Sequence, residues 1–197
     1  VCSPASFLSM RSIEQVKVDV AYSRANVKLI GISGGVSYGA LGSTHHSTHD
    51  LAVMRAIPDI TIVLPSDNVS TEKLVRAIAV HDGPVYMRLG RGPVENFHSP
   101  DYEPVIGRGD VLRHGTDLTI VAAGEVTLFA LEAGKALEDL GVSAEVIELA
   151  TIKPLDAELV LRSAKKTGLV LTVEEHSVFG GLGGAVAELL STSYPVP

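Results

Sequence analysis

Residues Gly42–Asp67 read GSTHHSTHDLAVMRAIPDITIVLPSD, and this stretch indicates the fold class more clearly than any other. A glycine-flanked polar segment with three histidines comes first. The apolar residues that follow have helical spacing until Pro58, and the β-branched run Ile60–Leu64 predicts a buried strand. Open α/β sheets bind their ligands at loops between strand and helix, so we expect chemistry at the histidines.

The same alternation of strand and helix runs through the rest of the chain. Pro154 and Asp156 suit the start of a helix, because proline has the required backbone angle and aspartate caps the first turn. Strands separated by helices pair in parallel through right-handed crossovers. The sequence therefore predicts an α/β protein of two small doubly wound domains with mainly parallel sheets. The periodicity predicts strands at 27–32, 60–64, 85–89, 118–123, 143–149 and 169–173, and helices at 7–21, 49–56, 69–80, 126–140, after 154 and at 184–190.

A segment without periodicity separates the two halves. Residues 91–108, RGPVENFHSPDYEPVIGR, are rich in proline and glycine. We expect a first domain over 1–100, a linker over 101–113 and a second domain over 114–197. Because the chain starts without methionine and ends just after a helix, we expect that the first domain lacks its N-terminal part and that the second is incomplete.

Composition narrows the class of protein. The chain has 197 residues, 46% of them apolar, and a net charge of -7, which argues against a general nucleic-acid or acidic-membrane surface. A single cysteine, Cys2, excludes an internal disulfide framework. No segment approaches the roughly 18 consecutive apolar residues of a membrane span, and the first residues, VCSPASFLSM, lack the basic region and the long apolar run of a signal peptide. We expect no membrane association and a cytoplasmic location.

Three segments match known functional motifs but have simpler structural explanations. Gly31–Gly35 fits the G-x-S-x-G nucleophile elbow of hydrolases, but that elbow leads directly into a helix, so Ser33 is favoured as a polar loop group. His45, His46 and His49 could ligate a metal, yet no HExxH glutamate or nearby cysteine accompanies them, so we expect no metal site in this chain. The GGLGGA at 180–185 lacks the third glycine of a dinucleotide fingerprint and predicts a tight turn before a helix.

Two arginines are more informative. Arg88 and Arg91 lie in MRLGRG, at the end of a predicted buried strand, which is where α/β sheets bind ligands. Guanidinium groups bind phosphate with two parallel hydrogen bonds. The pair therefore predicts a phosphate site, with two solvated surface arginines as the alternative.

Five segments follow one another along the chain: FLSMRSIEQVKVDVAY, NVKLIGISGGVSYGALGSTHHSTHDLAVMRAIPDITIVLPSD, GPVYMRLGRG, IVAAGEVTLFALEAGKALEDLGVSAEVIELATIKPLD and VEEHSVFGGLGGAVAELL. In this order they resemble the C-terminal half of the thiamine-diphosphate-dependent transketolase family. The resemblance covers nearly the whole chain and is greatest to the C-terminal subunit of split transketolases. It implies a thiamine-diphosphate-binding pyrimidine domain followed by a Rossmann-like C-terminal domain.

The resemblance implies roles for three residues near the cofactor. Phe7 matches the aromatic residue that packs against the aminopyrimidine ring. Arg11, one helical turn later, supports that site. His45 matches the catalytic histidine that contacts substrate oxygens and exchanges protons or polarises the carbonyl.

The resemblance also implies a substrate channel. Arg88 matches the arginine that binds the phosphate of a sugar phosphate, and Arg91 is a second contact. Ser33 stands in the channel where the family has a histidine, and Leu41 stands where it usually has an acid. Since a donor hydroxyl facing leucine would lose its partner, we expect an altered preference among ketoses.

The resemblance further implies a partner. In this family the pyrophosphate-binding domain holds the diphosphate and Mg²⁺, so thiamine diphosphate would bind between this chain and an N-terminal subunit, in a homodimer or heterotetramer. The activating glutamate lies upstream of Phe7 in the family, outside any segment matched here.

We therefore expect a subunit of a transketolase that moves a two-carbon ketol unit between sugar phosphates. The alternatives are a 1-deoxy-D-xylulose-5-phosphate synthase and a non-catalytic regulatory or assembly subunit; the β subunit of a 2-oxo acid dehydrogenase is more distant.

Overall fold

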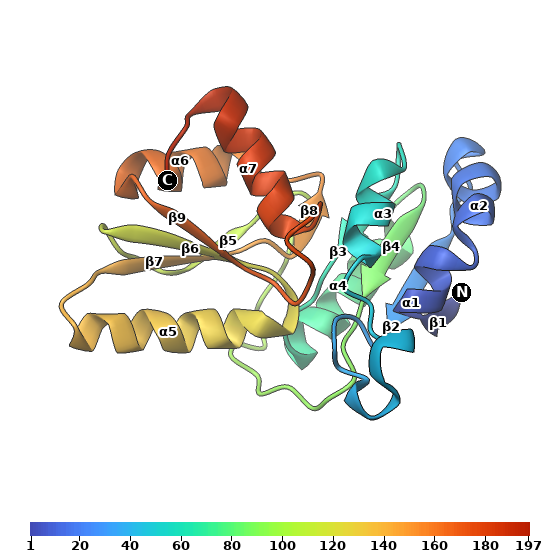
Figure 1. Cartoon of the computed structure of the whole chain (residues 1–197), viewed down its shortest axis with the longest axis horizontal. Helices are drawn as coiled ribbons and strands as arrows, with labels where there is room; N and C mark the ends of the chain where they lie inside the picture. Colours follow the sequence, from blue (N-terminus) through green and yellow to red (C-terminus); the bar gives the residue numbers. More distant parts are fainter.

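A computed structural model describes residues 1–197 and contains two sheets with helices around them (Figure 1). The first sheet has the strand order β1-β2-β4-β3-β8, and the second has the order β5-β7-β6-β9. The strands are β1 (Cys2–Pro4), β2 (Lys28–Ile32), β3 (Thr61–Val63), β4 (Val85–Arg88), β5 (Asp110–Arg113), β6 (Leu118–Ala122), β7 (Ala144–Glu148), β8 (Thr151–Lys153) and β9 (Val170–Val173). The helices are α1 (Ala5–Met10), α2 (Ile13–Gln15), α3 (Asp50–Ala56), α4 (Asn68–Val80), α5 (Thr127–Asp139), α6 (Ala157–Thr167) and α7 (Leu182–Ser193), with a π-helix at Val16–Tyr22 and 3-10 helices at Gly39–Thr44 and Gly124–Val126.

Both sheets are mainly parallel, as the alternation predicts. In the first sheet, β1, β2, β4 and β3 pair in parallel, and in the second, β7, β6 and β9 do so. Strands β3 and β4 are buried along their whole length, which explains their continuous apolar runs. The expected α/β class with two mostly parallel sheets is therefore confirmed. No helix of the chain has the length and apolar character needed to cross a bilayer.

Three short strands were not expected. Strand β1 pairs with β2 where a helix was predicted to start almost at once, and the helix predicted over 7–21 is divided into α1, α2 and the π-helix. Strand β5 occupies the end of the predicted 101–113 linker and pairs antiparallel with β7. Strand β8 follows β7 in the sequence but joins the first sheet, antiparallel to β3. Each strand has only three or four residues, so its pairing, rather than its own sequence pattern, defines it.

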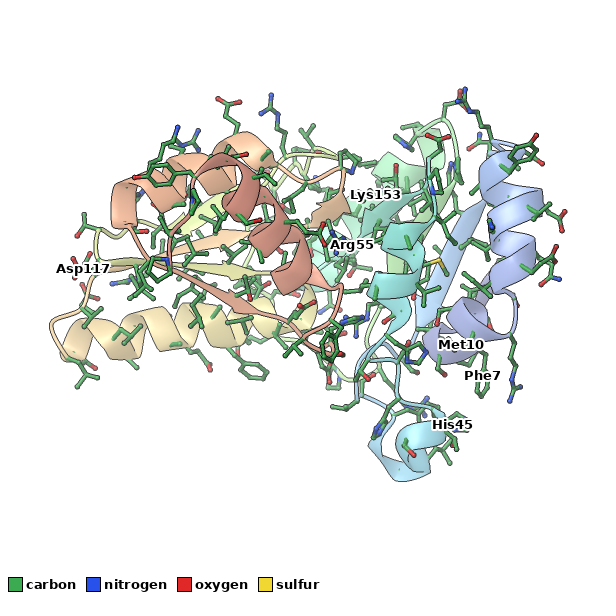
Figure 2. The ribbon with its side chains drawn as sticks, turned by 45° about the horizontal axis from the view of Figure 1, so that its top comes forward. Phe7, Met10, His45, Arg55, Asp117 and Lys153 are labelled. Atoms are coloured by element: carbon green, nitrogen blue, oxygen red, sulfur yellow. The ribbon has the colours of Figure 1, made fainter.

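One apolar core connects the two sheets. A cluster of 23 buried residues includes Leu51 and Met54 of α3 together with Ile147 of β7 and Leu182 of α7. Burying a leucine or methionine side chain completely contributes about 1.5–3 kcal/mol. Polar contacts of Arg55 in α3 support the same interface (Figure 2): its Nη1 atom donates to the carbonyl oxygen of Gly180 at 2.7 Å, and its Nη2 atom pairs with Glu188 of α7 at 2.7 Å. The sheets are therefore held in one arrangement.

Helix starts follow the local sequence. The Asp156 carboxylate accepts the N–H of Leu159 at 3.0 Å, which confirms the predicted cap of α6. Asp67 and Ser70 form a reciprocal capping box at the start of α4.

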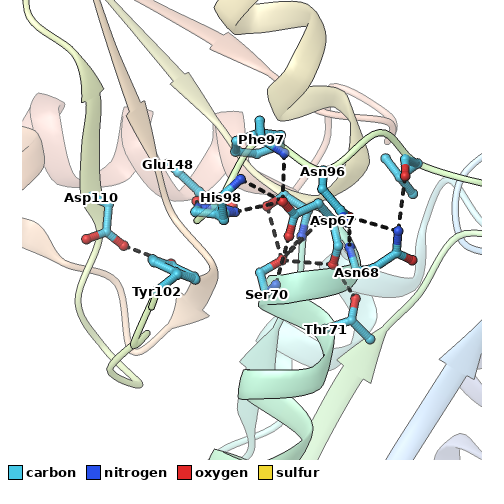
Figure 3. Close-up of polar contacts among 12 residues, drawn as sticks. Asp67, Asn68, Ser70, Thr71, Asn96, Phe97, His98, Tyr102, Asp110 and Glu148 are labelled. Atoms are coloured by element: carbon cyan, nitrogen blue, oxygen red, sulfur yellow. Dashed lines mark hydrogen bonds and ion pairs between the residues drawn. The ribbon is translucent and has the colours of Figure 1, made fainter. Parts of the chain in front are cut away.

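The capped end of α4 belongs to a buried polar cluster, which we call the His98 junction: Asp67, His98, Tyr102, Asp110 and Glu148 (Figure 3). The His98 side chain is 5% exposed; its Nε2 atom lies 2.9 Å from Oε2 of Glu148 and its Nδ1 atom 3.2 Å from Oδ2 of Asp67. Tyr102 stacks on His98 with ring centroids 3.8 Å apart and donates to Asp110. The cluster joins the segment between the sheets to both of them.

Candidate functional site at the histidine loop

The three histidines lie on a loop with a closed base, Gly34–His49, which we call the histidine loop. It leaves the end of β2 and returns at the start of α3. The backbones of Gly35 and Ser47 exchange two hydrogen bonds, at 3.0 and 2.7 Å, and form the neck of the loop. Gly35 has a φ of 62°, a conformation that glycine adopts without strain. The neck fixes where the loop begins and ends, while its tip projects from the molecule (Figure 2).

His45 lies in a group of aromatic rings at one side of the loop. Its ring centroid is 5.0 Å from that of Phe7, edge to face, and 5.4 Å from that of Tyr38. The hydroxyl of Thr44 lies 3.0 Å from Nδ1 of His45, and Nε2 makes no hydrogen bond within the chain. Since His45 and Phe7 are only half-buried, both rings are accessible to a ligand.

Two cations flank these rings. The guanidinium of Arg11 lies 4.2 Å from the centre of the Phe7 ring, and that of Arg91 lies 3.9 Å from the centre of the Tyr38 ring. Both arginines are exposed, and guanidinium groups favour the faces of aromatic rings. We call Arg11, Phe7, His45, Tyr38 and Arg91 the aromatic cluster.

Arg88 belongs to a different arrangement, at the neck of the loop. Its Nε atom is 3.3 Å from Oδ2 of Asp50, a carboxylate that is fully buried. Its Nη2 atom donates to the carbonyl oxygens of Ser47, at 3.3 Å, and Glu175, at 2.6 Å. Tyr86 donates to the same Asp50 oxygen at 2.6 Å, and burial, followed by the charge of Asp50, raises the pKa of Tyr86 well above its ordinary value. We call these five residues the Arg88 junction.

The structure brings together four of the six residues singled out in the sequence: Phe7, Arg11, His45 and Arg91. Arg88, which is 8% exposed, is not the solvated surface arginine considered as an alternative. Ser33 is 2% exposed with a φ of 59°, and a loop rather than a helix follows it.

Sequence reasoning missed two residues at this site, Tyr38 and Glu175. The signal for Tyr38 was available, because an aromatic residue inside a glycine-rich loop stands out from its neighbours. Glu175 gave no such signal, since the residues it contacts are far away in the sequence.

The glycine-rich turn before α7 holds no free anion site. The carboxylate of Glu174 accepts the N–H groups of Leu182, at 2.6 Å, and Gly183, at 2.8 Å. Part of the positive end of this helix is therefore satisfied within the chain.

Family models account for most of the sequence. The model of the transketolase pyrimidine binding domain matches residues 4–95, and that of the transketolase C-terminal domain matches residues 107–196. The chain belongs to the transketolase family. Thiamine diphosphate is the cofactor that this family implies.

Individual relatives agree. The chain is 52% identical, over all of its length, to one subunit of the apulose-4-phosphate transketolase of Phocaeicola vulgatus, and it covers 63% of that relative. It is 44% identical to the 6-deoxy-6-sulfo-D-fructose transketolase subunit SqwH of a Clostridium species, with 98% of this chain and 60% of that one covered. It thus spans about 60% of the length of these relatives.

Solved structures give the same result. A structure described as a split gene transketolase, in an inactive beta4 tetramer, matches with a TM-score of 0.93 and 44% identity, over 100% of this chain and 63% of that one. Among the sequence relatives, a 1-deoxy-D-xylulose-5-phosphate synthase of Heliobacterium modesticaldum is 40% identical over 91% of this chain but only 28% of that protein.

The residues present fit one end of thiamine diphosphate. Phe7 and His45 offer half-buried aromatic rings of the kind that an aminopyrimidine packs against. Near them, buried side-chain atoms of His46, Ser47 and His49 have no hydrogen-bond partner within the chain. Buried polar atoms in proteins are usually hydrogen-bonded, so these atoms are available to a ligand or a partner chain. No group of three His, Cys, Asp or Glu side chains lies close enough to hold a metal ion.

Proposed function

We propose that this chain supplies the pyrimidine side of the active site in a transketolase that moves a two-carbon ketol unit between sugar phosphates. The observation that carries the proposal is the aromatic cluster, where His45 lies between Phe7 and Tyr38 with Nε2 unpaired. A ring face for a planar cofactor and a histidine for substrate oxygens lie side by side there.

Each residue of the cluster has a separate task. Phe7 stacks on the aminopyrimidine, and Arg11 covers the other side of Phe7 and keeps water from it. His45, oriented by the contact between Nδ1 and Thr44, presents Nε2 to the substrate carbonyl or hydroxyl, where it donates or accepts a proton. Thiamine diphosphate, when bound, supplies the carbanion chemistry.

Phosphate binding falls mainly to Arg91 in this proposal. Arg91 is exposed and rests on Tyr38, so it can turn toward a phosphate without breaking an ion pair. Arg88 lines a small cavity with Gly34 and Gly90 and contributes positive charge to it, although Nη2 is already bound to two carbonyl oxygens. Ser33 lies buried below the same loop.

The rest of the catalytic machinery comes from a partner. We propose that an N-terminal subunit holds the diphosphate and Mg²⁺, and that the cytoplasmic enzyme is a homodimer or a heterotetramer of both chains. We further propose domains at 1–100 and 114–197, with the connecting residues 101–113 ending in β5.

The test is ketol transfer from a ketose phosphate to ribose 5-phosphate. The full-length protein that contains this chain is mixed with its candidate N-terminal subunit, thiamine diphosphate and Mg²⁺. His45→Ala should lower turnover by about 10²-fold or more, because general acid–base catalysis contributes this much. His114→Ala is the matched control, since this histidine side chain is 88% exposed and directly follows β5 of the second sheet.

The outcomes separate the alternatives. Turnover with pyruvate as donor, but not with a ketose phosphate, would favour the synthase. A complex that binds the cofactor without turnover of either donor would favour a non-catalytic subunit.

A further inference from the structure

A segment of the second sheet packs against the neck of the histidine loop. We call Glu174–Gly181, between β9 and α7, the clamp segment. The N–H of Ser177 donates to the carbonyl oxygen of Thr48 at 2.9 Å, near the end of the loop. At the beginning of the loop, Oε1 of Glu175 accepts the N–H of Val36 at 3.0 Å. The clamp segment therefore contacts the loop on both sides of its neck.

Glu175 makes a further contact through its backbone. Its carbonyl oxygen accepts the 2.6 Å hydrogen bond from Nη2 of Arg88, which also binds Ser47 in the neck and pairs with Asp50. One residue of the second sheet thus holds the loop directly at Val36 and indirectly through Arg88.

The neighbouring glycines leave room for these contacts. A side chain at Gly35 would overlap the carboxylate of Glu175, and one at Gly34 would overlap the guanidinium of Arg88. The approach of the clamp segment is therefore close as well as polar.

Glu175 accepts the N–H of Val36 with a carboxylate oxygen. A charge-assisted hydrogen bond to a backbone N–H is about twice as strong as a neutral one. Burial raises the pKa of nearby Glu125, and the negative charge of Glu175 raises it further. Both carboxyl groups line the small cavity beside Arg88.

We propose that Glu175 is a positioning residue, which holds the neck of the histidine loop through Val36 and Arg88 and so sets the place of His45 relative to Phe7. The catalytic part of this inference rests on the proposed function. In these terms the second sheet contributes no reacting group, but it determines the geometry of one that lies on the first.

The test compares four variants of the full-length protein. Glu175→Ala removes the acceptor, Glu175→Asp keeps the charge but falls short of Val36, and Glu175→Gln keeps an oxygen within reach. Glu188→Ala is the control: it removes another contact between the two halves, the 2.7 Å ion pair with Arg55, and leaves Arg55 bonded to the carbonyl oxygens of Gly180 and Gly181 in the clamp segment.

The first readout is hydrogen exchange of residues 36–48, which requires no activity. We expect Glu175→Ala and Glu175→Asp to speed exchange there about tenfold or more, the size of one lost hydrogen bond to a charged group. Glu175→Gln keeps an acceptor but loses the charge, so its exchange should fall between those of the wild type and Glu175→Ala, and Glu188→Ala should be unchanged in this segment.

The second readout is steady-state ketol transfer by the assembled enzyme. A displaced His45 weakens contacts made in the transition state, so kcat should fall about tenfold in Glu175→Ala, with KM for the donor within about twofold. Glu175→Gln should restore most of kcat, a rescue that a loss of fold stability would not show.

Either of two results would overturn the proposal: wild-type exchange of residues 36–48 in both Glu175→Ala and Glu175→Asp, or an equal effect of Glu188→Ala. If the wild type shows no ketol transfer but exchange responds as expected, the positioning role of Glu175 stands and the proposed function fails. Should Glu175→Ala not fold, the comparison of Glu175→Asp with Glu175→Gln decides.

Discussion

The Arg88 junction and the His98 junction each pair a buried carboxylate with a cation, but the two cations differ. In each, a carboxylate with no exposed surface pairs with a cation: Asp50 with Arg88, and Glu148 with His98. A guanidinium stays charged at any pH at which proteins are studied, whereas an imidazole loses its charge within the physiological range. The cation of the Arg88 junction therefore keeps its charge over this pH range, whereas the cation of the His98 junction titrates.

The surroundings of His98 determine the direction of that sensitivity. Burial by itself lowers the pKa of His98, but the hydrogen bond and the charge of Glu148, with the charge of Asp67, outweigh it and raise the pKa above its ordinary value. Burial alone would raise the pKa of Asp67, yet N–H groups of Ser70, His98 and Phe97 lower it. Both groups therefore prefer to be charged in the folded protein.

Of the substitutions at the two junctions, Arg88→Ala should lower the free energy of unfolding most. It leaves Asp50 buried without a cation, so we expect a loss of about 3–5 kcal/mol in the free energy of unfolding, measured by urea denaturation. The loss should be equal at pH 6 and pH 9. Arg91→Ala, an exposed arginine of the same strand end, should cost less than about 1 kcal/mol. A loss below about 1 kcal/mol for Arg88→Ala would contradict the assignment of Arg88 as the cation that compensates the buried Asp50.

His98→Gln should have the next largest effect, and a pH-dependent one. Because the folded pKa of His98 lies above its unfolded value, its contribution is complete below about pH 6.5 and is lost as pH rises through the folded pKa. We expect a loss of about 1.5–3 kcal/mol at pH 6 that shrinks toward pH 9. His114→Gln should keep the wild-type slope, and a slope that persists in His98→Gln would assign it to another group.

Asp67→Asn should destabilise the protein less and should separate the effects of the two carboxylates on His98. Asparagine still caps α4, so we expect a loss of about 1 kcal/mol. Removal of one carboxylate should lower the pKa of His98 but leave it above its ordinary value, since Glu148 remains. An NMR titration of His98 measures this. An unchanged pKa would show that Glu148 alone holds the imidazolium.

Glu188→Ala gives the reference for an ordinary contact between the halves. Its ion pair with Arg55 is 2.7 Å long, but the glutamate is 68% exposed. We expect a loss of no more than about 1 kcal/mol, weakened further by salt. A larger loss of stability, measured by thermal unfolding, would mean that this exposed pair stabilises the fold as much as the buried junctions do.

The sequence predicted what is local in the fold and missed what depends on distant pairing. The β-branched run Ile60–Leu64 is enough to predict a strand, and the apolar periodicity of α4 is enough to predict a helix. Strands β5 and β8 are not, because an antiparallel partner elsewhere in the chain defines each of them.

The candidate site divides in the same way. The histidine loop was visible from its glycines and histidines, since those residue types have few structural reasons to gather there. Glu175 was not, because Val36 lies 139 residues away. Arg88 was located at the correct strand end, but only the fold shows that it faces Asp50.

Strand β8 has a consequence for how the protein is made. The first sheet reaches its full width only when residues 151–153, which follow most of the second sheet in the sequence, lie beside β3. A nascent chain that has left the ribosome only as far as residue 113 therefore exposes the edge of β3, with N–H and C=O groups ready to pair with another chain. Folding during synthesis cannot finish one half before starting the next, and a gene cut between the halves would separate a sheet from its own last strand.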